Sequence, residues 1–156
     1  MTDQLIAVVD GARARFFATG GRKTPRGEEK KKLDEIETLI NPAHRVKDAD
    51  MFSDLRPGSR RASVGGAAHG FDDKRDAHAE EFDRKFAQLV LEKLAHLVAD
   101  NHAKAVILAA GPRMLGHLRD QRVSMPDGVV VGEFPKQLTD LSAHELCLRL
   151  QADDLI

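Results

Sequence analysis

This sequence is nearly free of cysteine and has no tryptophan or tyrosine. The single cysteine, Cys147, excludes an intrachain disulfide, which fits a protein of a reducing compartment. The absence of tryptophan and tyrosine leaves the core to Leu, Val, Ile, Ala and seven Phe. Packing must therefore come from aliphatic side chains and a few Phe rings, without covalent cross-links.

The sequence also lacks an excess of one charge and any long hydrophobic run. It has 24 basic and 25 acidic residues, so the whole chain makes no electrostatic case for nucleic acid or membrane, and any such case must be local. No stretch approaches the ~20 apolar residues of a membrane span. The N-terminus has no basic region and only five apolar residues in a row, Leu5 to Val9, which does not fit a secretory signal. We expect a cytoplasmic protein with no membrane association.

The size and composition of the chain are typical of one globular domain. Its 156 residues are 42% hydrophobic and 31% charged, far from the composition of a disordered chain. A chain of this length buries a sizeable core without a disulfide or a structural metal. We predict a single domain over residues 1–156.

The N-terminal part predicts three strands. Leu5 to Val9 is apolar and β-branched, Asp10-Gly11 reads as a turn, and Ala14 to Thr19 resumes the apolar pattern. These features predict an antiparallel pair whose first strand is central and buried on both faces. Gly20 to Lys32, with six basic residues, reads as an exposed loop. Leu33 to Ile40 is then predicted as a third strand.

The C-terminal part predicts alternating helices and strands. Asp76 to Val98 has the spacing of an amphipathic helix, and Ala105 to Ala110 reads as a buried strand parallel to the first. A short helix over Arg113 to Asp120 and a strand over Val129 to Phe134 follow. The apolar face expected for the long helix consists of Ala79, Phe82, Phe86, Leu89, Val90, Leu94 and Leu97.

The last element is a helix with a clear start. Ser142 and Glu145 have the spacing of a capping box, and Leu141 and Leu146 have that of a hydrophobic staple. Cys147 falls on the inward face of this helix and is interpreted as a small core residue rather than a nucleophile. The predicted fold class is α/β, a mixed sheet in which N-terminal antiparallel strands are followed by α-β-α-β-α with right-handed crossovers.

Between the third strand and the long helix lies a stretch with no periodicity, about residues 44–73. So long a stretch inside a small domain is either functional or disordered. It contains Arg56, Arg60 and Arg61 with no acidic residue between Asp54 and Asp72. Gly65-Gly66 would let main-chain N–H groups approach a ligand closely, and the arginines would contact phosphates. A flexible loop without a partner remains the alternative.

Catalytic and metal-binding motifs are mostly absent. There is no Walker loop, no G-x-S-x-G elbow and no H-E-x-x-H sequence. His44, His69 and His78 are spaced too irregularly to predict a metal site. A carboxylate at the end of a first central strand, such as Asp10, is also how metal-dependent nucleases hold their ions, and such a site needs further carboxylates beside it. The candidate partners are Asp48, Asp50, Asp54, Asp72 and Asp73.

Several segments together resemble the bacterial host attachment protein family. The likeness runs from about Leu5 to Leu150. The segments that carry it are Val8-Val-Asp-Gly-Ala-Arg-Ala-Arg-Phe-Phe17, Asn41-Pro-Ala-His44, Asp54-Leu-Arg-Pro-Gly58, the Gly-rich loop, the helix after Asp76 and Gly111-Pro-Arg-Met-Leu-Gly116. The family name implies a role in attachment to host cells, and an adhesion-related interaction protein is one alternative function.

That family is similar to the middle domain of archaeal and eukaryotic class 1 peptide-chain release factors, which implies a ribonuclease H-like topology. In those factors a Gly-Gly-Gln loop precedes the long helix, and here Gly65 and Gly66 match the two glycines. Ala67 stands where the glutamine would be, and a methyl group cannot position a water or a tRNA hydroxyl.

The resemblance therefore implies binding rather than hydrolysis. We predict a non-catalytic module that associates with the ribosome, tRNA or rRNA and needs no cofactor or metal. The predicted contact residues are Arg56, Arg60, Arg61, Gly65, Gly66 and His69. A metal-dependent nuclease or other hydrolase centred on Asp10 is the alternative from the enzyme class.

Overall fold

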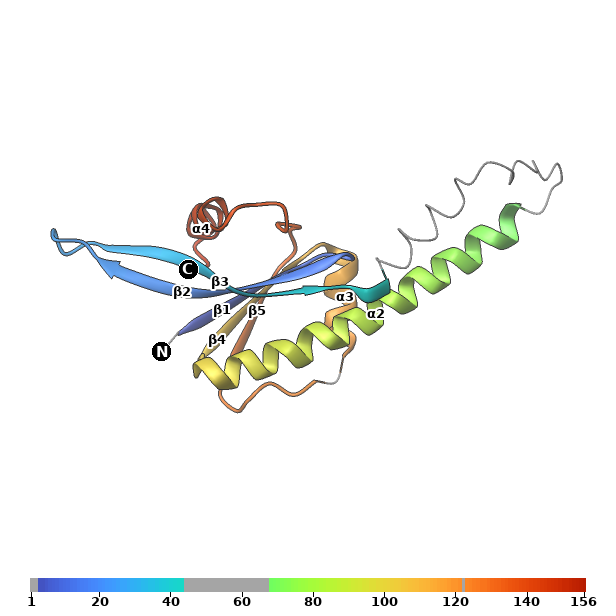
Figure 1. Ribbon diagram of the computed structural model, residues 1–156, viewed down its shortest axis with the longest axis horizontal. Helices are drawn as coiled ribbons and strands as arrows, with labels where there is room; N and C mark the ends of the chain where they lie inside the picture. The colour runs from blue at the N-terminus through green and yellow to red at the C-terminus, as the bar shows by residue number, and fades with distance from the viewer. Residues whose placement is uncertain (1–2, 44–67, 122) are drawn as a thin grey trace.

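A five-stranded mixed sheet flanked by helices forms the body of the molecule (Figure 1). The computed structural model describes residues 3–43, 68–121 and 123–156. The elements are β1 (Gln4–Val9), β2 (Arg13–Lys23), β3 (Glu29–Ile40), α2 (Ala68–Asn101), β4 (Ala105–Ala110), α3 (Pro112–Asp120), β5 (Val130–Phe134) and α4 (Ala143–Ala152).

The strands lie in the order β3-β2-β1-β4-β5, so β1 is central and β3 and β5 are the two edges. β1 pairs antiparallel with β2 and parallel with β4, and β4 pairs parallel with β5. All five residues from Leu5 to Val9 are 0% exposed, because helices cover both faces of the central strand. The mixed α/β sheet and its buried first strand are as the sequence predicted.

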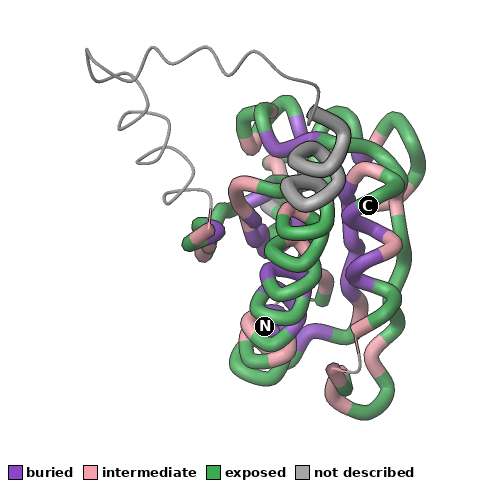
Figure 2. Tube along the Cα trace, turned by 90° about the vertical axis from the view of Figure 1, so that its right-hand side faces the viewer, coloured by how far each residue is buried: buried purple, intermediate pink, exposed green. Residues whose placement is uncertain are grey.

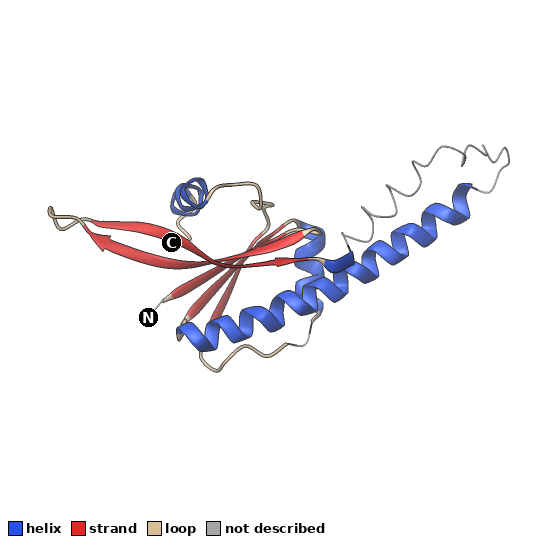
Figure 3. Cartoon of the chain, in the orientation of Figure 1, coloured by secondary structure: helices blue, strands red, loops and turns tan. Residues whose placement is uncertain are grey.

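Helices α2 and α3 cover one face of the sheet, and α4 covers the other (Figure 3). Alternate residues of β1 pack into the hydrophobic clusters on the two faces of the sheet. Leu5, Ala7 and Val9 belong to the cluster under α2 and α3. Ile6 and Val8 pack on the opposite face with residues of α4. Figure 2 shows this buried core between exposed outer surfaces.

The apolar face of α2 differs partly from the prediction. Phe86, Val90 and Leu94 are buried against the sheet as expected, whereas Phe82 and Leu89 are 38% and 42% exposed. These two side chains line an apolar hollow of about 330 Å³ beside residues 41–43, so they lie to one side of the sheet-facing stripe. Helical spacing alone did not separate the two sides.

The start of α2 is earlier than predicted. The sequence placed the end of a loop at Asp73 and the start of the helix at Asp76, but α2 begins at Ala68, so the backbone of His69 is helical. A helix that continues beyond the body needs no apolar face, and its first turns therefore carry no hydrophobic period.

The predicted loop over Gly20 to Lys32 is also wrong. β2 continues to Lys23 and β3 begins at Glu29, which leaves only residues 24–28 as the turn of a hairpin. The Gly27 N–H donates to the Thr24 carbonyl at 2.9 Å, and Gly27 has a φ of 80°, a region that favours glycine. Cross-strand hydrogen bonds sustain this hairpin although most of its β3 side chains are exposed.

The C-terminal elements follow the prediction closely. The Ser142 hydroxyl accepts from the Glu145 N–H at 3.2 Å, and the Ser142 N–H donates to the Glu145 carboxylate at 2.8 Å, which completes the capping box. Leu141 packs against the same cluster as Leu146. Of the helices in the part of the chain that the structure describes, none has the length and hydropathy for a membrane crossing.

Candidate functional site

The turn after β1 is held by Asp10. Its Oδ1 accepts hydrogen bonds from the N–H groups of Ala12 and Arg13 at 2.7 and 2.8 Å, and its Oδ2 accepts from the Thr139 hydroxyl at 2.5 Å. Asn41 adds a side-chain donor to the Gly11 carbonyl at 2.8 Å. Both carboxylate oxygens of Asp10 therefore have structural partners, and the turn interpretation of this residue fits the geometry.

Two arginines of β2 fasten the segment before α4 to the sheet. Arg13 and Arg15 both donate to the Thr139 carbonyl, at 2.7 and 3.0 Å, and Arg15 also donates to the Leu141 carbonyl at 2.6 Å. A bidentate pair with Glu35 at 2.8 and 3.0 Å completes the bonding of Arg15. The hydrogen bond from Arg15 lowers the pKa of Glu35, and that from Glu35 raises the pKa of Arg15.

An open cleft of about 610 Å³ lies at the carboxyl ends of β1 and β4. Asp10 and Asp83 line it together with Arg113, which also pairs with Glu80 of α2 at 3.1 Å. Ligands of α/β proteins bind at this end of the strands, so the position is a favourable one. Within residues 3–43, 68–121 and 123–156, however, no three His, Cys, Asp or Glu side chains gather as metal ligands.

The residues predicted to contact RNA lie mostly outside the described part of the chain. The predicted contact residues outside it are Arg56, Arg60, Arg61, Gly65 and Gly66. Ala67 and three of the five aspartates proposed as partners of Asp10 also lie outside it. Of the predicted set, His69 alone falls in an element, the first turn of α2. Asp72 and Asp73, the other two of these aspartates, belong to the backbone of α2.

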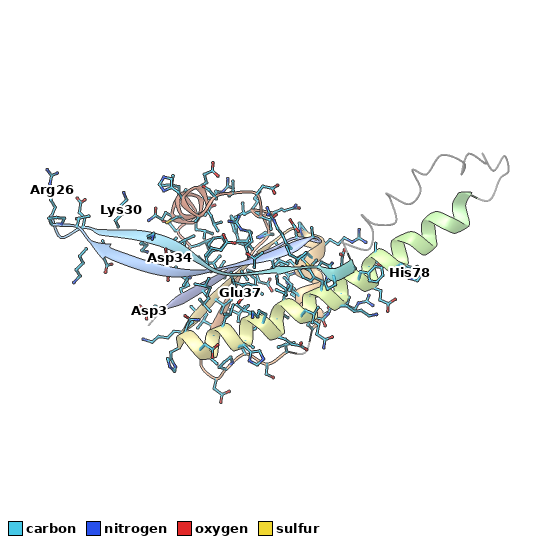
Figure 4. All side chains as sticks on the ribbon, viewed as in Figure 1. Asp3, Arg26, Lys30, Asp34, Glu37 and His78 are labelled. Atoms are coloured by element: carbon cyan, nitrogen blue, oxygen red, sulfur yellow. The ribbon has the colours of Figure 1, made fainter. Side chains whose placement is uncertain are left out.

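Helix α2 extends well beyond the sheet (Figure 1). Among residues 77–101, whose burial is described, the first buried side chain is Phe86, and the ion pair between Glu80 and Arg113 ties the helix to α3. The twelve residues from Ala68 to Ala79 precede that tie and span about 18 Å of helix. Figure 4 places His78 on this part of the helix, away from the sheet.

A second feature was missed from the sequence, a groove between the edge strand β3 and α4. Two adjoining hollows of about 500 and 420 Å³ share Lys30, Lys31, His144 and Cys147 as lining residues. The Cys147 thiol donates to the Lys31 carbonyl at 3.5 Å, and burial raises its pKa. Cys147 is 5% exposed, as expected of a small core residue, but it also forms part of the groove floor.

The basic run from Lys30 to Lys32 was the only sequence signal for this groove. From the sequence alone, this run is predicted to lie in an exposed loop, Gly20 to Lys32. The contact that forms the groove joins Lys31 to Cys147, which are 116 positions apart in the sequence. No local pattern predicts such a contact.

Comparison with known proteins assigns the chain to a family. No curated protein matches the sequence. A solved structure described as "Archaeal protein" is similar over 98% of this chain, with 14% identity and a TM-score of 0.41. The match covers 34% of that structure, so this chain spans about a third of its length. A family model for "Protein required for attachment to host cells" matches residues 5–150, and the chain belongs to this host attachment family.

Proposed function

We propose that this host attachment family protein is a non-catalytic module that binds the ribosome or its RNA in the cytoplasm. The proposed contact is the Arg- and Gly-rich segment from Arg56 to His69, which leads directly into α2. We also infer a fold like the middle domain of class 1 release factors, with a ribonuclease H-like topology. The strand order β3-β2-β1-β4-β5, with β4 and β5 parallel to β1, supports that inference.

The observation that carries the proposal is the projection of α2. This helix is packed on the sheet from Phe86 onward and tied to α3 through Glu80, whereas its first twelve residues extend past the body. The chain therefore enters α2 at a point remote from the sheet. A binding segment attached there reaches a large partner without a clash between that partner and the sheet.

Local charge supports a phosphate-bearing partner. The sequence between Asp54 and Asp72 contains Arg56, Arg60 and Arg61 and no acidic residue, in a chain whose formal net charge is −1. Arginine forks make bidentate hydrogen bonds to phosphate, and neighbouring glycines let backbone N–H groups approach it. Such contacts position a partner on an RNA backbone without reading its sequence.

The absence of catalysis rests on the residue that follows the two glycines. Ala67 has no polar atom on its side chain, so it cannot orient a water or a tRNA terminal hydroxyl. Asp10 supports the same conclusion from the body of the domain, because its two oxygens are engaged by Ala12, Arg13 and Thr139.

Sedimentation with ribosomes tests the proposal. Labelled protein is spun with ribosomes over a range of salt from 50 to 200 mM, and the double variant Arg60→Ala plus Arg61→Ala is compared with the native chain. Two lost phosphate contacts should weaken binding and reduce the slope of log K against log salt by about 2.

A charge-matched control lies at the other end of the molecule. Lys23→Ala plus Arg26→Ala removes the same two charges from the β2–β3 hairpin and should leave the salt slope nearly unchanged. Failure of the native protein to sediment with ribosomes at 50 mM salt would contradict the proposal. Equal losses in the two double variants would also contradict it, since they would indicate only a response to overall charge.

A further inference from the structure

The groove between β3 and α4 combines three features that suit one kind of ligand. The first is an open strand edge. β3 is at the end of the sheet, and the Lys31 carbonyl points away from β2, toward Cys147 of α4. In an antiparallel ladder, residues two apart point the same way, so the backbone groups of Glu29 and Leu33 also face outward.

These outward groups are open to a new partner. In the described ranges of the chain, the thiol of Cys147 is the only hydrogen-bond partner found for the outward backbone groups of Glu29, Lys31 and Leu33. A thiol is a weak donor, and its 3.5 Å distance to the carbonyl oxygen is an ordinary one for sulfur. A backbone N–H from an added strand would make a stronger bond to the same carbonyl.

The second feature is a row of positive charge. Lys30, Lys31 and Lys32 line the groove, whereas Glu28 and Glu29 line its end beside the hairpin turn, and Figure 4 shows Lys30 on the outer part of β3. Lys32 is paired with Asp34 at 2.7 Å, whereas no carboxylate lies within salt-bridge distance of Lys30 or Lys31 among the residues that the structure places. Their charge is available to an acidic ligand.

The third feature is an apolar floor. Leu33 and Cys147 are buried at the base of the groove, and Leu148, 54% exposed, borders it. Apolar side chains of a ligand would lose water against this floor, and the lysines would stay at the rim. A phosphate backbone has no group to place there, so the floor favours a peptide over RNA.

We propose that this groove binds an extended acidic peptide segment of a partner protein, which adds to β3 as a sixth strand. Backbone hydrogen bonds from the edge give affinity, and alternate apolar side chains face the floor. The acidic side chains lie on the other face of the added strand and meet Lys30, because successive side chains of a strand point to opposite faces. The Lys31 carbonyl exchanges the Cys147 thiol for a backbone N–H of the peptide. This site is separate from the segment before α2 and does not depend on the proposed ribosome binding.

Fluorescence anisotropy with short peptides tests the site. The probe is a labelled eight-residue peptide of alternating Val and Glu, and its two controls are the same peptide with Lys in place of Glu and the same peptide with alternate backbone N-methylation. We expect saturable binding of the first and at least tenfold weaker binding of both controls. Equal binding of the methylated peptide, or no binding of the first peptide at millimolar concentration, would overturn the proposal. The lysines would then serve only to prevent edge-to-edge association of β3 with other chains.

Paired variants locate the binding. Lys30→Glu plus Lys31→Glu should weaken the Val-Glu peptide at least tenfold. The control variant is Lys104→Glu plus Lys136→Glu, which changes two exposed lysines that do not line the groove. Its affinity for the Val-Glu peptide should change less than twofold. Equal effects of the two pairs would overturn the assignment, and so would displacement of the peptide by a uridine oligonucleotide with higher affinity for the groove.

Hydrogen exchange distinguishes strand addition from simple charge attraction. On saturation with the Val-Glu peptide, amide exchange on the outward side of β3, at Glu29, Lys31 and Leu33, should slow at least tenfold. Amides of the opposite edge strand β5 should be unaffected. Binding without protection on β3 would show that the peptide does not add as a strand.

Discussion

At the scale of single residues, Asp10 and Thr139 link the first turn of the sheet to the segment before α4. Thr139 is fully buried, and its hydroxyl has Asp10 as its acceptor. Thr139→Val keeps the shape of the side chain but leaves a carboxylate oxygen without this donor, and we expect a loss of about 1–2 kcal/mol in the free energy of unfolding. Urea denaturation of the two proteins measures it. Unchanged stability would show that water replaces the hydroxyl without cost.

The pair between Arg15 and Glu35 predicts a dependence of stability on pH. Because the pKa of Glu35 is lower in the folded chain than its ordinary value of 4.5, its contribution is fully present above that value. It is lost as the pH falls through the lower, folded pKa. With discount for the partial exposure of Glu35, the pair contributes about 1 kcal/mol.

The corresponding measurement compares the native chain with Glu35→Gln in urea at several pH values. The difference in the free energy of unfolding should be largest near pH 7 and should shrink as the pH is lowered toward 3. A difference that stays constant over this range would mean that the charge of Glu35 contributes nothing.

At the scale of elements, the start of α4 depends on its capping box. Ser142→Ala removes the acceptor for the Glu145 N–H and should cost about 1 kcal/mol of stability. Ser124→Ala, an exposed serine of the loop before β5, serves as the control and should be neutral. Thermal unfolding of the two variants gives the comparison. Equal melting temperatures would indicate that packing of Leu146 and Leu150 alone fixes the helix.

Elements with a local signal were predictable, and elements without one were not. β1, β4 and α4 follow from apolar runs and a capping box, because their side chains are buried or bonded within a few residues. The sequence does not predict the outer hairpin or the first turns of α2, since neither segment has the apolar periodicity from which strands and helices are predicted. Lys31 and Cys147 were each visible in the sequence, but only the folded sheet brings them into one groove.

At the scale of the whole molecule, two projections leave the body at opposite ends (Figure 1). One is the β2–β3 hairpin, and the other is the start of α2. The chain termini lie elsewhere, close to each other, since the Gln4 side chain donates to the Leu155 carbonyl at 3.2 Å. Fusions at either terminus should therefore leave both projections free for the binding experiments above.

The projecting turns of α2 also fix the direction in which the preceding chain leaves the helix and its distance from the sheet. Each helical residue advances the chain by about 1.5 Å along the helix axis and turns it by about 100° about that axis. One residue inserted between Ala68 and Ala79 would shift the preceding segment only slightly along the axis but would rotate it by more than a quarter turn. Homologous chains that keep the same partner should therefore differ here by about seven or about eleven residues, which are close to two and three whole turns, or not at all.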